Sequence, residues 1–124
     1  GQVDKGGQPY ILHPLRVMMS VSGESEKIVA VLHDVVEDSD WTFEALFAEG
    51  FSVEVIGALK SVTKESEDED YDLFIQRAMR NHIGRKVKIA DLRDNLDVTR
   101  ITELGEKDLQ RINKYKKSLK ILTA

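Results

Sequence analysis

Hydrophobic residues recur along this chain with the spacing of helices. Between residues 24 and 38 the apolar side chains fall three or four positions apart, as they do along one face of an α-helix. Residues 71–80, 85–98 and 104–122 show the same recurrence. No stretch alternates in the manner of a half-buried strand, so the pattern predicts an all-α fold.

Capping and helix-breaking residues set the ends of these predicted helices. Pro14 suits the first turn of a helix, and Gly23 ends that same helix. Ser52 can cap a helix start, and Gly84 interrupts the apolar pattern between two later helices. The chain is therefore expected to form a bundle of about six or seven helices, over residues 11–22, 24–38, 42–50, 53–62, 71–80, 85–98 and 104–122.

Length and composition indicate one globular domain over residues 1–124. Hydrophobic residues make up 41% of the chain and charged residues 32%, and the net charge is −4. The negative charge argues against nucleic-acid and anionic-membrane partners, and no apolar run approaches the roughly 20 residues of a membrane span. The absence of cysteine excludes disulfides and thiolate metal sites and is compatible with a cytoplasmic protein. The first residue is Gly rather than Met, which leaves open a preceding helix; the oligomeric state is also left open.

The most unusual stretch places one imidazole and three carboxylates among valines and leucines. In a continuous helix His33 and Glu37 share one face, and Asp34 and Asp38 share another, because each pair is four residues apart. The neighbours His33 and Asp34 diverge by about 100° around the axis, yet both could bind an ion lying between them. Burying several ionisable groups is costly unless a partner or a metal compensates, so this stretch is a candidate site.

Two other stretches offer metal ligands. His13 precedes a proline at a helix start, and Asp91 lies among apolar residues with Asn95 one turn later. Taken singly, His13 could cap or pack a helix, and Asp91 could pair with Arg16 or Lys88. Together with the first stretch they form a mixed nitrogen and oxygen set suited to Mn²⁺, Fe²⁺ or Zn²⁺, which leaves room for water and substrate: His13, His33, Asp34 and Asp91.

The remaining acidic and basic residues have simpler interpretations. Glu37, one turn after His33, is placed to take a proton from a metal-bound water, and Asp38 to orient that water or hold a ligand. The charge run over 64–70 is interpreted as a solvated loop or helix entry. The basic last helix, 104–122, could pack on the core, line a dimer or meet a partner, and packing on the core with a solvated basic face is the preferred interpretation.

Three blocks resemble the HD-domain phosphohydrolases, in particular the hydrolase domain of the Rel/Spo stringent-response enzymes and their small stand-alone relatives. The blocks are GQVDKGGQPYILHPLRV, LHDVVED and KIADLRDN, in that order. The resemblance implies an all-α HD-domain bundle that hydrolyses the 3′-pyrophosphate of (p)ppGpp to GDP or GTP and pyrophosphate. It also implies Mn²⁺ bound by His13, His33, Asp34 and Asp91, a catalytic pair Glu37 and Asp38, and a substrate contact from Asn95.

Two positions depart from the long enzymes of that family. They carry Arg-Lys where this chain has Asp4-Lys5, and a basic residue near the position of Asp97. Carboxylates there should weaken binding of a substrate with several phosphates. The candidate phosphate partners that remain are Lys5, the best matched, and Arg16, Lys86, Lys88, Arg93 and Arg100.

Three other functions remain open alongside ppGpp hydrolysis. The same metal chemistry could act on another nucleotide, such as a nucleoside monophosphate or NADPH. Alternatively, the chain could be a metal- and nucleotide-binding regulatory domain with little turnover, although such a domain would not need the Glu37-Asp38 pair. A helical bundle that uses these acids only for salt bridges explains poorly why carboxylates lie among valines and leucines.

Overall fold

The computed structural model describes residues 12–97, 99, 101 and 103–124, and over these residues the chain is helical without strands. The all-α prediction is confirmed. No helix among the described residues is long and apolar enough to cross a membrane. The helices are α1 Leu12–Met19, α2 Glu24–Leu32, α3 Val35–Asp38, α4 Phe43–Ala48, α5 Val53–Ser61, α6 Tyr71–Arg80, α7 His82–Asn95 and α8 Glu106–Thr123.

The described residues form eight helices where the sequence predicts seven ranges, because the helix predicted over 24–38 is divided. α2 ends at Leu32 and the single-turn helix α3 begins at Val35, with a turn at His33 and Asp34 between them. The expectation of one continuous helix is therefore wrong. The break matters for the site, because the side chains of His33 and Asp34 lie toward each other, with Nε2 of the first 3.4 Å from Oδ1 of the second.

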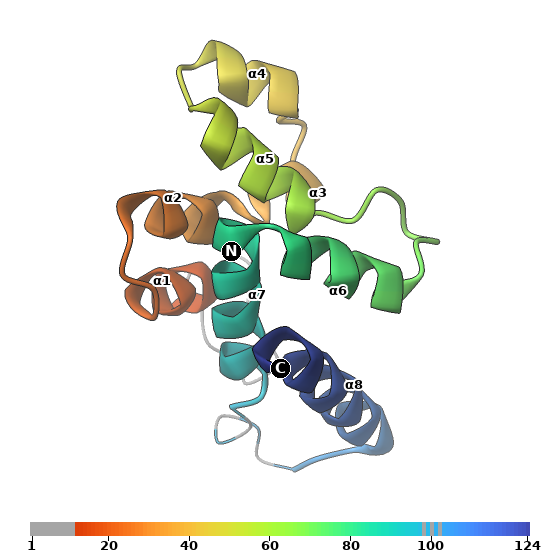
Figure 1. The fold of residues 1–124 in the computed structure, drawn as a ribbon. Coiled ribbons are helices and arrows are strands. Elements are labelled where there is room, and N and C mark those ends of the chain that lie inside the picture. Colours follow the sequence, from red (N-terminus) through yellow and green to blue (C-terminus); the bar gives the residue numbers. More distant parts are fainter. Residues whose placement is uncertain (1–11, 98, 100, 102) are drawn as a thin grey trace.

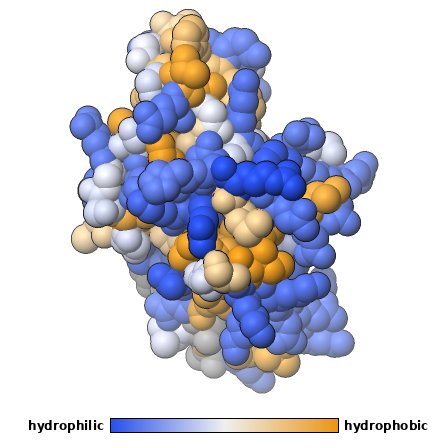
Figure 2. Space-filling model, in the orientation of Figure 1, coloured by the Kyte–Doolittle hydropathy of each residue, from blue (hydrophilic) through white to orange (hydrophobic). Residues whose placement is uncertain are grey.

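Helix α7 lies at the centre of the fold and packs against α1, α2, α5, α6 and α8 (Figure 1). The larger core cluster joins α1, α2, α4, α5, α6 and α7. A smaller cluster joins α6, α7 and α8 through the fully buried Ile75, Leu92 and Leu122. Helix α5 runs from this centre to α4, which lies farthest from it, and apolar side chains are exposed over these two helices at the top of the view in Figure 2.

Gly84 lies inside α7 and does not interrupt it, so that expectation is also wrong. The break is at Asn81, whose side chain accepts a hydrogen bond from the Gly84 N–H at 2.8 Å and caps the helix start. A Cβ atom at position 84 would lie 1.9 Å from the hydroxyl of Ser61 on α5. Glycine is therefore required because α5 and α7 approach closely here.

Replacement of this glycine should weaken the fold. We expect Gly84→Ala to lower the free energy of unfolding by about 1–3 kcal/mol, because the added methyl overpacks the α5–α7 contact. Urea unfolding measures the loss. The added Ser61→Ala substitution removes the clashing hydroxyl and should restore part of it. Gly57→Ala in α5, where a Cβ meets open space, is the matched control and should be neutral or stabilising.

Candidate active site

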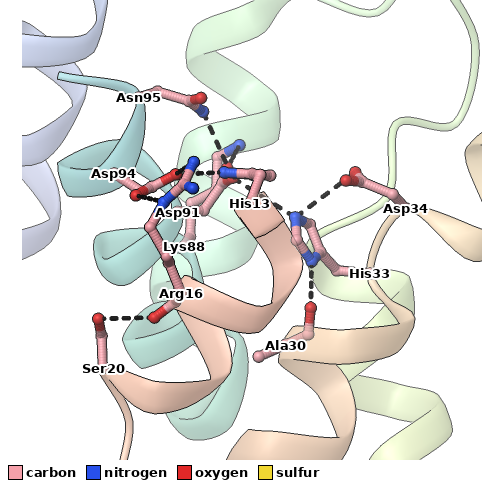
Figure 3. A network of polar contacts seen from close by, with 10 residues as sticks. All are labelled: His13, Arg16, Ser20, Ala30, His33, Asp34, Lys88, Asp91, Asp94 and Asn95. Atoms are coloured by element: carbon pink, nitrogen blue, oxygen red, sulfur yellow. Dashed lines mark hydrogen bonds and ion pairs between the residues drawn. The ribbon is translucent and has the colours of Figure 1, made fainter. Parts of the chain in front are cut away.

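Three separate elements bring the four predicted ligands to one point (Figure 3). His13 comes from α1, His33 and Asp34 from the turn after α2, and Asp91 from α7. One oxygen of Asp91, Oδ1, lies 2.8 Å from Nε2 of His13 and 3.4 Å from Nε2 of His33. His13, His33 and Asp34 also offer ligand atoms that all lie within 4.8 Å of one another. The structure therefore places together residues that are up to 78 positions apart in the sequence.

Each imidazole is held by a hydrogen bond at Nδ1, the ring nitrogen that faces away from the place where the four side chains converge. Nδ1 of His13 lies 2.6 Å from Oδ2 of Asp94, and Nδ1 of His33 lies 2.6 Å from the carbonyl oxygen of Ala30. Because these oxygens are acceptors, each Nδ1 carries the proton of the bond, and Nε2 of each ring faces Asp91. Metal-binding histidines are oriented by a second hydrogen bond of this kind.

Asp94 was not singled out from the sequence. Its carboxylate is itself held by Arg16, which donates from Nε at 2.6 Å and from a terminal nitrogen at 3.0 Å. Asp94 follows Asp91 by three residues, so both carboxylates lie on the same face of α7, and that spacing was the available signal.

Asp91 remains ionised although it is buried. Burial opposes its charge, but the Lys88 ammonium and hydrogen bonds from the two imidazoles hold the pKa of this carboxyl well below its usual range. Lys88 donates to Oδ2 of Asp91 at 2.9 Å. The pairing of Asp91 with Lys88, considered as an alternative to a ligand role, is present and involves the other carboxylate oxygen.

The donor set fits a divalent metal ion. Two imidazole nitrogens and two carboxylates converge, and the charge of the carboxylates is only partly offset by Lys88. Burial lowers the pKa of His33, but the hydrogen bond to Asp91 and the charges of Asp91 and Asp34 raise it to about 9. The pKa of His13 is also raised, because its bonds to Asp91 and Asp94 outweigh burial. A metal must therefore displace protons from these rings.

Metal affinity should consequently depend on pH. The apparent affinity for Mn²⁺ is expected to rise about tenfold or more per pH unit from neutrality toward 9, because binding displaces the His33 proton and, where it is bound, the His13 proton. Calorimetry in buffers of different ionisation enthalpy measures both the affinity and the released protons. In the metal-free protein the raised pKa stabilises the fold fully below pH 6.5, and this contribution is lost as the pH rises through about 9. A flat affinity profile would contradict the assignment of His33 as a ligand.

The two predicted catalytic acids differ in position. Glu37 lines the same pocket as His33 and Asp34, and its Oε1 accepts a hydrogen bond from the backbone N–H of Lys64 at 3.1 Å. Asp38 is exposed and is not among the residues that line this pocket. Burial and the neighbouring charge of Asp34 raise the pKa of Asp38.

The pocket beside the four converging residues has a volume of about 140 Å³. Asn95 lines it and donates to Oδ1 of Asp91 at 3.4 Å. In Figure 2 apolar surface is visible between α6 and α8, bordered by hydrophilic side chains. Cationic and aromatic side chains make up much of the remaining lining: Lys64, Lys88, Lys114, Tyr71, Phe74 and Tyr115.

Lys64 and Lys114 change the interpretation of two sequence segments. The charge run 64–70 was expected to be a solvated loop, yet Lys64 at its start lines the pocket. The last helix was expected to pack on the core with its basic side chains solvated, yet Lys114 lies 4.3 Å from the centre of the Tyr71 ring and lines the same pocket. Both lysines reach the pocket only through tertiary packing, so their sequence carries no local signal.

The other phosphate candidates lie elsewhere. Lys5, Asp4 and Arg100 fall outside the described residues, and Arg93 is exposed away from the pocket. Arg16 is bound to Asp94 and Lys86 lies 3.2 Å from Glu26. Asp97 accepts hydrogen bonds from the backbone and side chain of Thr99. Of the candidates within the described residues, only Lys88 lines the pocket.

Comparison with known proteins identifies the family, although no protein-family model matches the chain. The chain is 34% identical to the zebrafish (Danio rerio) guanosine-3′,5′-bis(diphosphate) 3′-pyrophosphohydrolase MESH1, over 90% of this chain and 67% of that protein. It is 32% identical to the human protein of the same name, over 90% of this chain and 68% of that protein. The chain belongs to the MESH1 family.

A solved structure and a long bacterial enzyme extend the comparison. The MESH1-family chain superimposes on a protein described as "a metazoan ortholog of SpoT" that "hydrolyzes ppGpp", with a TM-score of 0.75, 26% identity, and coverage of 96% of this chain and 74% of that one. It is also 32% identical to the Aquifex aeolicus guanosine-3′,5′-bis(diphosphate) 3′-pyrophosphohydrolase, over 77% of this chain and 15% of that protein. The resemblance to this hydrolase group and its all-helical fold are confirmed.

Proposed function

We propose that this protein hydrolyses the 3′-diphosphate of ppGpp and pppGpp, releasing GDP or GTP and pyrophosphate. The observation that carries the proposal is the convergence of four metal-ligand side chains from three elements beside a pocket that also holds an acid and three lysines. The similarity to proteins named for this activity supports the same substrate. The substrate is therefore a small nucleotide.

We assign His13, His33, Asp34 and Asp91 as the ligands of a divalent metal, with Mn²⁺ as the resident ion and Fe²⁺ or Zn²⁺ as alternatives. A divalent metal held there supplies a Lewis acid for a phosphoryl oxygen and lowers the pKa of a bound water. Other residues of the chain orient the two histidine ligands. Nδ1 of each imidazole is occupied by Asp94 or by Ala30, which leaves each Nε2 for the ion.

Glu37 is assigned as the base that receives the proton of the attacking water. One oxygen of its carboxylate is fixed by the Lys64 N–H, and the other has no partner among the described residues. Its place on the wall of the pocket, together with His33 and Asp34, supports this assignment. Asp38, beside Asp34, is assigned to orienting the water from outside the pocket wall.

The lysines and aromatic rings supply binding for the nucleotide. Lys88 is paired with Asp91 on the wall of the pocket, and Asn95 offers an amide to the ribose or a phosphate. Lys5 is assigned to substrate binding from the sequence resemblance. The long enzymes of the family carry basic residues at the position of Asp4 and near that of Asp97. Lys64 and Lys114 provide positive charge that partly compensates for this difference.

The deciding experiment is pyrophosphate release from ppGpp by protein that has been stripped of metal and then supplied with Mn²⁺. Release that requires the added metal is the expected result. Mn²⁺ binding without any release would retain the metal site and reject the alarmone as substrate. In that case nucleoside monophosphates and NADPH are the substrates to assay next. Failure to bind Mn²⁺ would contradict the assigned ligands.

A further inference from the structure

A second hollow adjoins the pocket and shares a wall with it. It has a volume of about 490 Å³, and two of its lining residues, Glu37 and Lys64, also line the pocket. The hydrogen bond from the Lys64 N–H to Glu37 therefore joins two residues that line both spaces. We call this second space the side hollow; α3, α4, α5, α6 and the segment that follows α5 contribute to it.

The side hollow carries more positive than negative charge. Lys60, Lys64 and Arg77 line it, against the two carboxylates Glu37 and Glu65. Arg77 is already engaged by Glu69 and by the carbonyl oxygen of Thr63.

Two of these cations are available to an anion. Lys60 and Lys64 make no ion pair with any described residue. Their ammonium groups lie 5.6 Å from the Phe43 ring centre and 5.9 Å from the Tyr71 ring centre, respectively. Phosphate groups are the natural ligands of such lysines.

The pocket is too small for a whole nucleotide. Sites that enclose a drug-sized ligand measure about 300–1,000 Å³, whereas this pocket measures about 140 Å³. It can therefore enclose the reacting phosphoryl group and its immediate neighbours, while other parts of the substrate or product extend beyond it. The side hollow is the adjoining space that reaches Glu37.

The proposed reaction determines which product faces Glu37. The water oxygen forms a bond to phosphorus while the bond from phosphorus to the ribose 3′ oxygen breaks. Glu37 takes a proton from the water, and the ribose oxygen takes up a proton. Attacking and leaving oxygens lie roughly in line, so the ribose departs on the side opposite to the water. The pyrophosphate, which now contains the water oxygen, is left on the Glu37 side.

We propose that the side hollow is a pyrophosphate subsite in which Lys60 and Lys64 bind the outer phosphate of the 3′-diphosphate and then the released pyrophosphate. This inference rests on the proposed function. It assigns a substrate-binding role to Lys60, which lines the side hollow but not the pocket. A substitution of Lys60 therefore tests the subsite without changing a residue of the pocket that contains the metal ligands.

The test uses inorganic pyrophosphate and GDP, each titrated into the metal-free protein so that the metal cannot chelate the ligand. Lys60→Gln should weaken pyrophosphate binding by about three- to fivefold, the effect of one exposed ion pair, and should leave GDP binding unchanged. Lys116→Gln, an equal loss of charge on the exposed side of α8, is the matched control and should change neither. Lys60 is exposed, so the variant is expected to fold normally.

A second measurement uses the active enzyme. In ppGpp hydrolysis, the inhibition constant of pyrophosphate should rise in Lys60→Gln by the same factor as its dissociation constant. Unchanged pyrophosphate affinity in Lys60→Gln, or an equal weakening of GDP, would overturn the subsite. Failure of the proposed function looks different, because the wild-type protein would then not release pyrophosphate from ppGpp, whatever the result of the titrations.

Discussion

The Glu37→Gln variant is expected to lose about 10²- to 10⁴-fold in kcat, the usual effect of removing a general base, while it binds Mn²⁺ as the wild type does. The amide oxygen of glutamine can still accept the Lys64 N–H, so the local geometry should persist. What is lost is the proton acceptor. Steady-state kinetics and calorimetric Mn²⁺ titration measure the two effects separately.

Glu49→Gln is a suitable control for this variant. It makes the same change on the exposed end of α4, away from the pocket, and should leave kcat unchanged. If Glu37→Gln turned over substrate at the wild-type rate, Glu37 would not be the base. If the variant also lost Mn²⁺, Glu37 would belong to the ligand set instead.

Asp91→Asn should abolish Mn²⁺ binding and activity and also lower the free energy of unfolding by about 3–5 kcal/mol. The stability loss arises because Lys88, largely buried beside Asp91, would lose the carboxylate that balances its charge. Chemical denaturation, calorimetry and the pyrophosphate-release assay report the three effects. Adding Lys88→Met to Asp91→Asn removes the uncompensated cation and should recover most of the stability but no activity.

Asp34→Ala is the informative contrast to Asp91→Asn. Its carboxylate is only partly buried and lies 3.4 Å from Nε2 of His33, so its loss should abolish metal binding and activity at little cost in stability. Normal Mn²⁺ affinity in either variant would refute its assignment as a ligand. Equal destabilisation by both would contradict the central structural role given to Asp91.

The candidate metal site could be predicted because its residues violate the local pattern. His33, Asp34 and Asp91 are polar residues at positions where the apolar recurrence predicts a helix interior. The helices themselves follow from the same recurrence together with caps such as Ser52, which accepts from the Val55 N–H at 3.1 Å. The apolar recurrence and the helix caps are both properties of short stretches of sequence.

The remaining features depend on contacts between distant segments. The helical spacing of hydrophobic residues continues through the turn at His33, so this spacing does not indicate the break after Leu32. The local sequence predicts an interruption at Gly84, because the reason for this glycine, the approach of Ser61, lies 23 residues earlier in the chain. Lys64 and Lys114 reach the pocket from elements whose own composition is typical of solvated surface.

The hydrogen bonds that hold Nδ1 of both imidazoles have a consequence for how the enzyme is supplied with metal. Because Asp94, Arg16 and the Ala30 carbonyl orient the rings without help from an ion, the proposed coordination sphere is preorganised in the folded protein. A chelator should therefore yield an intact apoenzyme that reloads quickly, unlike small zinc domains that unfold when they lose their ion. Which ion occupies the protein would then follow metal availability in its surroundings.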